Sequence, residues 1–252
     1  MNKRMNKRIA VVTGGIGGLG TEICRSLARS GRQVIAADLD SHAERITTFR
    51  TATQEFNGSI VFEPLNVADH QLCADFVTHI GKTHGPISIL VNAAGITRDA
   101  SLRKMTYAQW SDVVKVNLES VFNMCRPVVD GMTEQGFGRI VNISSVNGQT
   151  GQFGQTNYSA AKAGMHGFTM ALAREVARKG VTVNSVSPGY CNTALVKAVP
   201  QDIRQQIIDS IPVGRLGEPS EIARAVDFLA HDDAGFITGA NIAVNGGYFM
   251  ES

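Results

Sequence analysis

The feature that most constrains the fold is a regular alternation of short β-branched runs with amphipathic stretches. Seven short runs are typical of strands: Arg8–Thr13, Gln33–Asp38, Ile60–Leu65, Ser88–Val91, Arg139–Ser144, Thr182–Ser187 and Asn241–Val244. Between them, apolar residues recur at helical spacing in six segments: Leu19–Ser30, His42–Phe56, Gln71–Lys82, Tyr107–Thr133, Tyr158–Arg178 and Pro219–Leu229. Strands that alternate with helical crossovers form parallel sheets with helices on both faces. The sequence therefore predicts a doubly wound α/β fold with seven parallel strands.

The chain is expected to form a single domain over residues 1–252. It has 252 residues, 43% of them hydrophobic, and no linker or shift in composition divides it. Two segments should differ from the rest. Residues 1–7, in which Met-Asn-Lys-Arg is repeated, are predicted to be a disordered extension. Residues 192–215 have the least regular pattern and are predicted to be a mobile substrate lid.

Charge and cysteine content exclude several classes of function. The net charge is +2, from 24 Lys and Arg against 22 Asp and Glu, which gives no field to attract nucleic acid or a membrane. The cysteines lie far apart with no Cys-x-x-Cys pair, which argues against a metal site and a disulfide framework. The apolar run Ile9–Val12 is far too short for a signal peptide or a membrane span. We expect a cytoplasmic protein that binds a small molecule and no metal.

The first predicted strand runs directly into a glycine-rich turn, Thr13–Gly20, that opens a helix. Glycines there let the backbone approach a pyrophosphate, and the helix N-terminus offers unpaired N–H groups. A tight turn needs glycine for positive φ as well. Because the turn lies in the first β-α unit, it favours a Rossmann-type dinucleotide site. The predicted cofactor contacts from this turn are Gly14, Gly18, Leu19 and Gly20.

Asp38 ends the second predicted strand, eighteen residues after Gly20. A carboxylate there accepts hydrogen bonds from the adenine ribose hydroxyls and repels a 2′-phosphate, which predicts NADH as the cofactor. NADPH remains the alternative because Arg45 is near in the sequence. Asp38 could instead cap the next helix, although Asp40 or Ser41 could also serve as that cap.

Tyr158 and Lys162 are four residues apart on a predicted helix, so their side chains share one face. Such a pair is common by chance and often means only a lysine that snorkels beside a half-buried ring. Ser145, however, follows a predicted buried strand and should lie at the carboxyl edge of the sheet, where α/β sites occur. These three residues predict a site for acid–base chemistry.

Together, the motifs resemble the short-chain dehydrogenase/reductase family from Arg8 to Gly247. The matching motifs are Thr13-Gly14-x3-Gly18-x-Gly20, Asn92-Ala93-Ala94-Gly95, Asn117, Ser145, Tyr158-x3-Lys162 and Pro188-Gly189. The resemblance implies that Tyr158 is the general acid, that Ser145 polarises the substrate carbonyl and that Asn117 holds a water near Lys162. It also implies a homotetramer and further cofactor contacts, from Asn66, Val67, Asn92, Ala93, Gly95, Tyr158, Lys162, Pro188, Gly189 and Thr193.

The chemistry of a tyrosine acid depends on its pKa, which is about 10 for a free side chain. A nearby Lys162 ammonium and the positive ring of an oxidised nicotinamide both favour the phenolate. We therefore expect the pKa of Tyr158 to be lowered.

The loop between Ser145 and Tyr158 resembles the branch of the family that reduces acetoacetyl-CoA for polyhydroxyalkanoate synthesis. This resemblance implies (R)-3-hydroxybutyryl-CoA as the product and an acyl pocket formed by Asp99, Ser145, Gln152, Phe153, Gln155 and Tyr190. Phe153 would close its apolar end, and the glutamine amides would orient the thioester. The usual members of that branch resemble NADPH-dependent enzymes, whereas Asp38 in this chain favours NADH.

Several alternatives remain open at this point. The chain could reduce 3-oxoacyl groups on acyl carrier protein, or oxidise alcohols or sugars without CoA. The loop could be a polar turn shaped only by solvent exposure. A nucleotide sensor without catalytic activity would normally lack the tyrosine or the lysine, and this chain keeps both.

Two predicted helices carry more apolar residues than one core contact needs, which is consistent with pairing across a subunit interface. These are the helices Tyr107–Thr133 and Tyr158–Arg178, and the apolar residues in the first are Val113, Val114, Val116, Leu118, Val121, Phe122 and Met124. The alternative is a well-buried helix beside the sheet.

Overall fold

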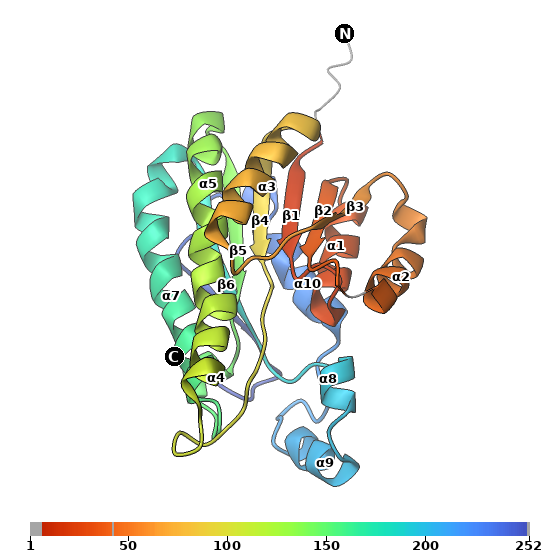
Figure 1. Ribbon diagram of the computed structural model, residues 1–252, viewed down its shortest axis with the longest axis vertical. Helices are drawn as coiled ribbons and strands as arrows, with labels where there is room; N and C mark the ends of the chain where they lie inside the picture. Colours follow the sequence, from red (N-terminus) through yellow and green to blue (C-terminus); the bar gives the residue numbers. More distant parts are fainter. Residues whose placement is uncertain (1–6, 42, 251–252) are drawn as a thin grey trace.

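The computed structural model describes residues 7–41 and 43–250, and within them a single parallel sheet organises the chain (Figure 1). Its strand order is β3-β2-β1-β4-β5-β6-β7. The strands are β1 (Ile9–Thr13), β2 (Gln33–Asp38), β3 (Ile60–Pro64), β4 (Ile87–Asn92), β5 (Gly138–Ile143), β6 (Val181–Pro188) and β7 (Asn241–Val244). Each boundary lies within one residue of its prediction, so the predicted seven-stranded parallel fold is confirmed.

The helices largely follow the amphipathic segments. They are α1 (Gly18–Arg29), α2 (Ala43–Ala52), α3 (His70–Thr83), α4 (Tyr107–Val114), α5 (Ser120–Gln135), α6 (Asn147–Thr150), α7 (Thr156–Val176), α8 (Ala194–Lys197), α9 (Gln201–Asp209) and α10 (Pro219–Leu229). The segment predicted as one helix over His42–Phe56 ends earlier, with a separate 3-10 turn at Gln54–Phe56, and His42 lies outside the described residues. A π-helical turn, η2 (Lys115–Glu119), separates α4 from α5.

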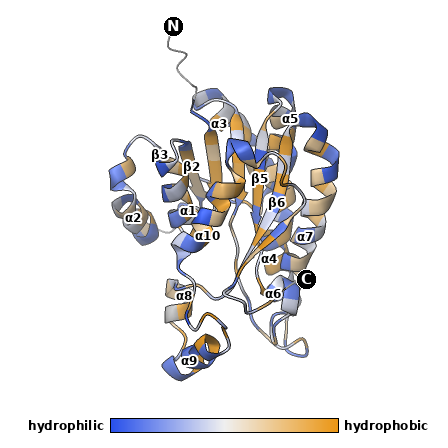
Figure 2. Cartoon of the chain, turned by 180° about the vertical axis from the view of Figure 1, so that it is seen from behind, coloured by the Kyte–Doolittle hydropathy of each residue, from blue (hydrophilic) through white to orange (hydrophobic). Residues whose placement is uncertain are grey.

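The sheet is covered on both faces, as Figure 1 shows. Side chains alternate along a strand, so β1 sends Ile9 and Val11 into the core under α3, α5 and α7, and Ala10 and Val12 into the core under α1 and α10. In Figure 2 the strands are coloured hydrophobic along their length, while polar colours lie on the helices around them. Burial on both faces is typical of parallel sheets and makes this one a rigid support.

The order of the strands reverses at β1, which pairs with β2 on one side and β4 on the other. In open α/β sheets, ligands bind outside the carboxyl ends of the strands at such a switch point. Figure 1 shows α8 and α9 lying beyond this edge of the sheet. The topology therefore places the candidate site between the strand ends and these two helices.

The segment 192–215 is more regular than the sequence suggested. It contains α8 and α9, although its sequence pattern is the least regular in the chain. The physical reason is that Ile203 and Ile207 recur at helical spacing between Pro200, which precedes α9, and Pro212. The mobility of this segment stays a prediction.

The described part of the chain begins at Lys7. Residues 1–6 of the predicted extension 1–7 lie outside the described residues, and Lys7 Nζ lies 3.4 Å from Ser59 Oγ. In the described part of the chain, no helix has the length and apolar character needed to cross a membrane.

Candidate active site

The glycine turn after β1 combines tight packing with an open helix end. Gly14 has φ +65°, and a Cβ there would lie 2.8 Å from the backbone of Ala94. The start of α1 has no side-chain cap, so its first N–H groups face outward without one. A Cβ on Gly18 would lie 3.5 Å from Thr193 Cγ2, so the turn and the segment after β6 lie close together. Glycines and free N–H groups in this arrangement fit the pyrophosphate of a dinucleotide.

Asp38 lies at the end of β2 beside this turn. Its carboxylate accepts hydrogen bonds from the N–H of Leu39 at 2.9 Å and of Ile16 at 3.4 Å. Because α2 begins only at Ala43, Asp38 does not cap that helix. Arg45 lies 3.9 Å from the carboxylate and near the glycine turn, so a cation and an anion share the place expected for the adenine ribose.

The segment that follows β4 is held in place mainly by hydrogen bonds and packing within the protein. The Asn92 amide is buried and donates to Asn142 Oδ1 at 2.8 Å, so this side chain belongs to the core. The N–H of Ala93 donates to Thr13 Oγ1. A Cβ on Gly95 would lie 2.7 Å from Asn117 Oδ1, which explains the need for glycine at that position. Backbone groups, and not the Asn92 side chain, remain for the predicted cofactor contact.

The other predicted cofactor residues frame the same edge of the sheet. Asn66 Oδ1 accepts from the N–H of Ala68, and the carbonyl of Val67 accepts from Asn123 at 3.0 Å. Pro188 ends β6, and the N–H of Gly189 donates to the carbonyl of Val244. These bonds fix the loops at this edge of the sheet, while contact with a cofactor stays a prediction for each residue.

Asn117 lies within the π-helical turn η2 and is fully buried. Its amide donates to the carbonyls of Ile96 and Val113, both at 2.9 Å, and its oxygen accepts from the N–H of Ile96 at 3.2 Å. π-Turns inside α-helices often occur at functional sites. Here the turn holds the loop after β4 in place. Gly95 of that loop lies between the side chains of Asn117 and Lys162.

Ser145, Tyr158 and Lys162 meet at the carboxyl end of β5. Lys162 is buried, its Nζ donates to the carbonyl of Ile143 at 2.7 Å, and it lies 5.6 Å from the centroid of the Tyr158 ring. Ser145 Oγ accepts from the N–H of Asn147 at 3.1 Å. The constellation predicted from sequence is therefore assembled in space.

The charges in this constellation differ from expectation. Burial lowers the pKa of Lys162 to about 7. Burial also raises the pKa of Tyr158, while a hydrogen bond with Ser145 lowers it and the charge of Asp99 raises it. The predicted depression of the Tyr158 pKa is therefore wrong for the protein chain alone, because desolvation by burial is the largest influence on that pKa.

Apart from Ser145, the predicted substrate residues lie in three separate surroundings. Asp99 and Gln155 are joined by a hydrogen bond of 2.8 Å from Gln155 Nε2 to Asp99 Oδ2. Gln152 is exposed, and Phe153 is 90% exposed, so Phe153 does not close a pocket in this structure. Tyr190 packs edge-on against Tyr248 with ring centroids 5.6 Å apart.

A cavity of about 110 Å³ lies beside Tyr190, between the end of β7 and the last part of the segment 192–215. Its apolar walls come from Ile211, Val213, Ile222 and Val244. Small-molecule sites usually combine such walls with a few polar groups, which Tyr190 and Asn245 supply here.

Two asparagines at the site were missed by the sequence analysis. Asn157 is buried and donates to the carbonyls of Arg98 and Gln109, both at 3.1 Å, while its oxygen accepts from the N–H of Tyr158 at 2.8 Å. Asn147 lies between Ser145 and Gln155. The available signal was an asparagine within two residues of each catalytic candidate, in a loop that was predicted to cover the substrate.

Comparison with known proteins agrees with this geometry. A family model described as "Enoyl-(Acyl carrier protein) reductase" matches residues 14–249. Acetoacetyl-CoA reductase of Allochromatium vinosum is 56% identical, covering 96% of this chain and 99% of its own. Acetoacetyl-CoA reductase of Cupriavidus necator is 50% identical, covering 98% and 100%. The 3-oxoacyl-[acyl-carrier-protein] reductase of Pseudomonas aeruginosa is 44% identical, covering 96% and 98%. The chain therefore belongs to the short-chain dehydrogenase/reductase family of nicotinamide-dependent oxidoreductases.

Proposed function

We propose that the protein reduces acetoacetyl-CoA to (R)-3-hydroxybutyryl-CoA. The observation that carries the proposal is the meeting of Ser145, Tyr158 and Lys162 at the switch-point edge of the sheet, in a chain 56% identical to an acetoacetyl-CoA reductase. A ketone held there faces two hydroxyl donors at the place where negative charge develops on its oxygen.

Each residue of the site has a separate task. Tyr158 is protonated at neutral pH because its pKa is raised by burial, so it is ready to donate a proton to the substrate oxygen. Ser145 Oγ accepts the Asn147 N–H, so the Ser145 hydrogen can be donated, to Tyr158 in the empty site and to the substrate oxygen when a ketone is bound. Asn117 holds the loop after β4 against Lys162, and its water-holding role is part of this proposal.

The residues around the glycine turn and Lys162 fit a nicotinamide dinucleotide, which supplies the hydride when bound. The glycine turn and the start of α1 would hold the pyrophosphate, and Lys162 would bond the nicotinamide ribose. Of the two cofactors, we propose NADH as the preferred one, because the Asp38 carboxylate accepts ribose hydroxyls and repels a 2′-phosphate. Arg45, only 3.9 Å from Asp38, limits that preference and lets NADPH bind more weakly.

The substrate class follows from the loops around the cavity near Tyr190. Apolar walls of Ile211 and Val213 suit a short acyl group, and Gln152 and Phe153 stand exposed at the rim, where they can contact the incoming thioester. The segment 192–215 would act as the lid that covers the substrate.

Reduction of 3-oxoacyl groups on acyl carrier protein is the second candidate. The 44% identity with a reductase of that name favours it. General oxidation of alcohols without CoA has no specific observation in its favour. The two reductases share their chemistry, so only the carrier distinguishes them.

The quaternary state and the compartment are part of the proposal. Phe122 on α5 and Met170 on α7 are about half exposed, whereas Val113, Val121 and Met124 are buried in the core. We propose that the exposed residues pair these helices in a homotetramer. The cysteines, Cys24, Cys73, Cys125 and Cys191, are free and buried, which suits the reducing cytoplasm.

The experiment that tests the function is a panel of initial rates. Acetoacetyl-CoA, its longer homologues and a carrier-bound 3-oxoacyl group are each supplied with NADH and with NADPH. We expect the highest kcat/KM for acetoacetyl-CoA with NADH, and the (R)-alcohol as the product. A preference for carrier-bound or eight-carbon substrates, or the (S)-alcohol, would replace the assignment with the second candidate. A kcat/KM for NADPH at or above that for NADH would overturn the role of Asp38.

A further inference from the structure

A chain of side-chain hydrogen bonds runs from Asp99 to the turn that holds Ser145. Gln155 Nε2 donates to Asp99 Oδ2 at 2.8 Å, and Gln155 Oε1 accepts from Asn147 Nδ2 at 2.9 Å. The backbone N–H of Asn147 then donates to Ser145 Oγ at 3.1 Å. The chain thus connects residues that are far apart in the sequence and ends on the candidate catalytic hydroxyl.

The carboxylate gives this chain a direction. An ionised carboxylate can only accept hydrogen bonds, so the Gln155 amide must turn its NH2 group toward Asp99. Its oxygen then faces Asn147, which must offer its own NH2 group in return. Asn147 Oδ1 is left buried and, among the described residues, has no donor. The opposite amide orientation would bring two oxygens together, so the charge on Asp99 determines how Gln155 and Asn147 lie.

The backbone around the chain is held tightly enough to transmit this order. A Cβ on Gly148 would lie 2.9 Å from the backbone of Lys162, so the turn 145–148 is wedged against α7. The N–H of Ala100 donates to the carbonyl of Gly154 at 2.9 Å, which joins the loop of Asp99 to the loop of Gln155. The amide of Gln155 is therefore the side-chain tie between two loops that are already adjacent.

We propose that Asp99, Gln155 and Asn147 form a directional hydrogen-bond chain that positions the Ser145 hydroxyl to donate to the substrate oxygen. Gln155 and Asn147 are then positioning residues, and Gln155 acts through Ser145 and not through contact with the thioester. The proposal rests on the role of Ser145 given under the proposed function.

A double-mutant cycle tests this coupling. Gln155→Met removes both amide bonds while it keeps the length of the side chain. We expect it to lower kcat about tenfold in the wild-type background and less than about twofold in the S145A background, because residues that act through one another are not additive. Ethyl acetoacetate serves as a second substrate in each background, since it lacks CoA and reports the reaction at the ketone alone.

Gln152→Met provides the comparison. It makes the same chemical change on the same exposed loop, three residues away, where no side-chain bond to the described protein is formed. If Gln152 contacts the thioester, its replacement should raise KM for acetoacetyl-CoA, spare ethyl acetoacetate and keep its full effect in the S145A background. Gln155→Met should leave the KM for acetoacetyl-CoA unchanged, lower kcat for ethyl acetoacetate as well, and lose most of its effect in the S145A background.

Two further readouts separate positioning from a general loss of structure. The dissociation constant of NADH and the Tm should be unchanged in the Gln155→Met variant. The pH at which alcohol oxidation is half-maximal should move upward, because the hydrogen bond with Ser145 lowers the pKa of Tyr158. Asp99→Asn, at an exposed position, repeats the cycle if the Gln155→Met variant does not fold.

The outcomes are decisive for the chain and for the function separately. Equal loss of kcat from Gln155→Met in both backgrounds, or no loss in the wild-type background, overturns the positioning role. Ser145→Ala alone tests the proposed catalytic role, since activity near wild type in that variant would overturn the proposed function first. If the enzyme reduces ethyl acetoacetate but not acetoacetyl-CoA, the double-mutant cycle can still be measured with ethyl acetoacetate. That result would reject only acetoacetyl-CoA as the substrate.

Discussion

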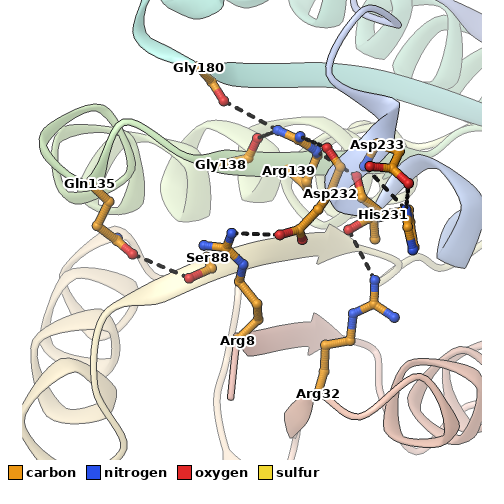
Figure 3. Close-up of polar contacts among 11 residues, drawn as sticks. Arg8, Arg32, Ser88, Gln135, Gly138, Arg139, Gly180, His231, Asp232 and Asp233 are labelled. Atoms are coloured by element: carbon orange, nitrogen blue, oxygen red, sulfur yellow. Dashed lines mark hydrogen bonds and ion pairs between the residues drawn. The ribbon is translucent and has the colours of Figure 1, made fainter. Parts of the chain in front are cut away.

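The two edges of the sheet both hold buried or partly buried cations, but they treat them differently. At the amino edge, Arg139 donates to the carbonyls of His231, Asp232 and Gly138 at 2.9 to 3.0 Å (Figure 3). Its guanidinium also lies 4.3 Å from the centre of the Phe137 ring. At the carboxyl edge, Lys162 donates to one carbonyl and is otherwise enclosed, so its pKa falls to about 7. Burial lowers the pKa of Arg139 as well, but a guanidinium bonded to several carbonyls stays charged, whereas Lys162 can change its protonation near neutral pH.

The pairing at the amino edge extends over several strands. Figure 3 shows Arg8 reaching Asp232 and Arg32 reaching the same turn from the start of β2. Arg32 also pairs with Asp227 of α10 at 3.0 Å. These bonds connect the starts of β1, β2 and β5 to the segment after α10, so this edge has a structural role. Changes there should alter stability, and changes at the carboxyl edge should alter the reaction.

The largest expected effect comes from Tyr158→Phe at the carboxyl edge. The ring keeps its shape, so folding and NADH binding should be preserved, but the proton donor is lost. General acid catalysis is typically worth about 10²–10⁴-fold, and kcat should fall by that factor. Steady-state kinetics and NADH titration measure the two properties on the same sample. A variant that keeps more than about a tenth of the wild-type kcat would exclude Tyr158 as the acid.

Arg139→Leu at the amino edge should have the opposite character. It leaves the carbonyls of Gly138, His231 and Asp232 without their donor, and hydrogen bonds to charged groups are worth about 1.5–3 kcal/mol each. We expect the free energy of unfolding in urea to fall by about 4 kcal/mol or more, with kcat/KM unchanged for the folded enzyme.

Arg29→Leu is the matched control for that measurement. Arg29 is 53% exposed and pairs with Glu55 at 3.3 Å on the surface of α1. Exposed pairs contribute about 0–1 kcal/mol, so this variant should be nearly as stable as the wild type. Equal losses in the two variants would mean that the amino edge is not the structural side of the comparison.

The same contrast explains what the sequence could predict. The strands were located within a residue, because β-branched runs buried on both faces repeat at regular intervals. Helical spacing places Tyr158 and Lys162 on one face, but such a pair is common by chance, and it was Ser145 and the other family motifs that identified it. The bonds of Arg139 could not be found, since its partners are backbone carbonyls on segments remote in sequence, which carry no residue-type signal. The tie between Asp99 and Gln155 escaped for the same reason, as two loops must meet before it exists.

The sequence did not predict the helices of the segment 192–215 for a different reason. α8 has four residues and α9 has nine, and prolines flank α9 on both sides. α8 is too short to show a helical period, and in α9 the helical spacing rests on only two residues, Ile203 and Ile207, between two prolines. The π-turn at Asn117 was equally hidden, because it interrupts an otherwise continuous helical pattern without a proline or glycine.

Lys162→Met sharpens the comparison through pH. The folded chain releases the Lys162 proton near pH 7, whereas the unfolded chain holds it to its ordinary value of 10.5. Between these values the unfolded state binds more protons, so this group makes the wild type more stable as pH rises. The Lys162→Met variant should be more stable than the wild type by a few kcal/mol at and below neutral pH, and the gap should close toward pH 10. Urea unfolding across this range measures the gap, and a gap independent of pH would show that Lys162 is paired as fully as Arg139.

The smallest effect is expected from Arg8→Gln, at the rim of the amino edge. Arg8 pairs with Asp232 at 2.8 Å and lies 3.4 Å above the Phe137 ring, but the two side chains of the pair are 36% and 56% exposed. Solvent screens such a pair, so the loss of stability should be about 0–1 kcal/mol and smaller still in 1 M salt. The bond from Arg8 holds the pKa of Asp232 below its usual value, which stabilises the fold above the ordinary pKa of the carboxyl and is lost as pH falls through the lowered one. The deficit of the variant should therefore be present at neutral pH and vanish in acid, with kcat unchanged throughout. Thermal unfolding at low and high salt, with activity assayed alongside, measures all three, and a change in kcat larger than the change in stability would show that the two edges are not separate in function.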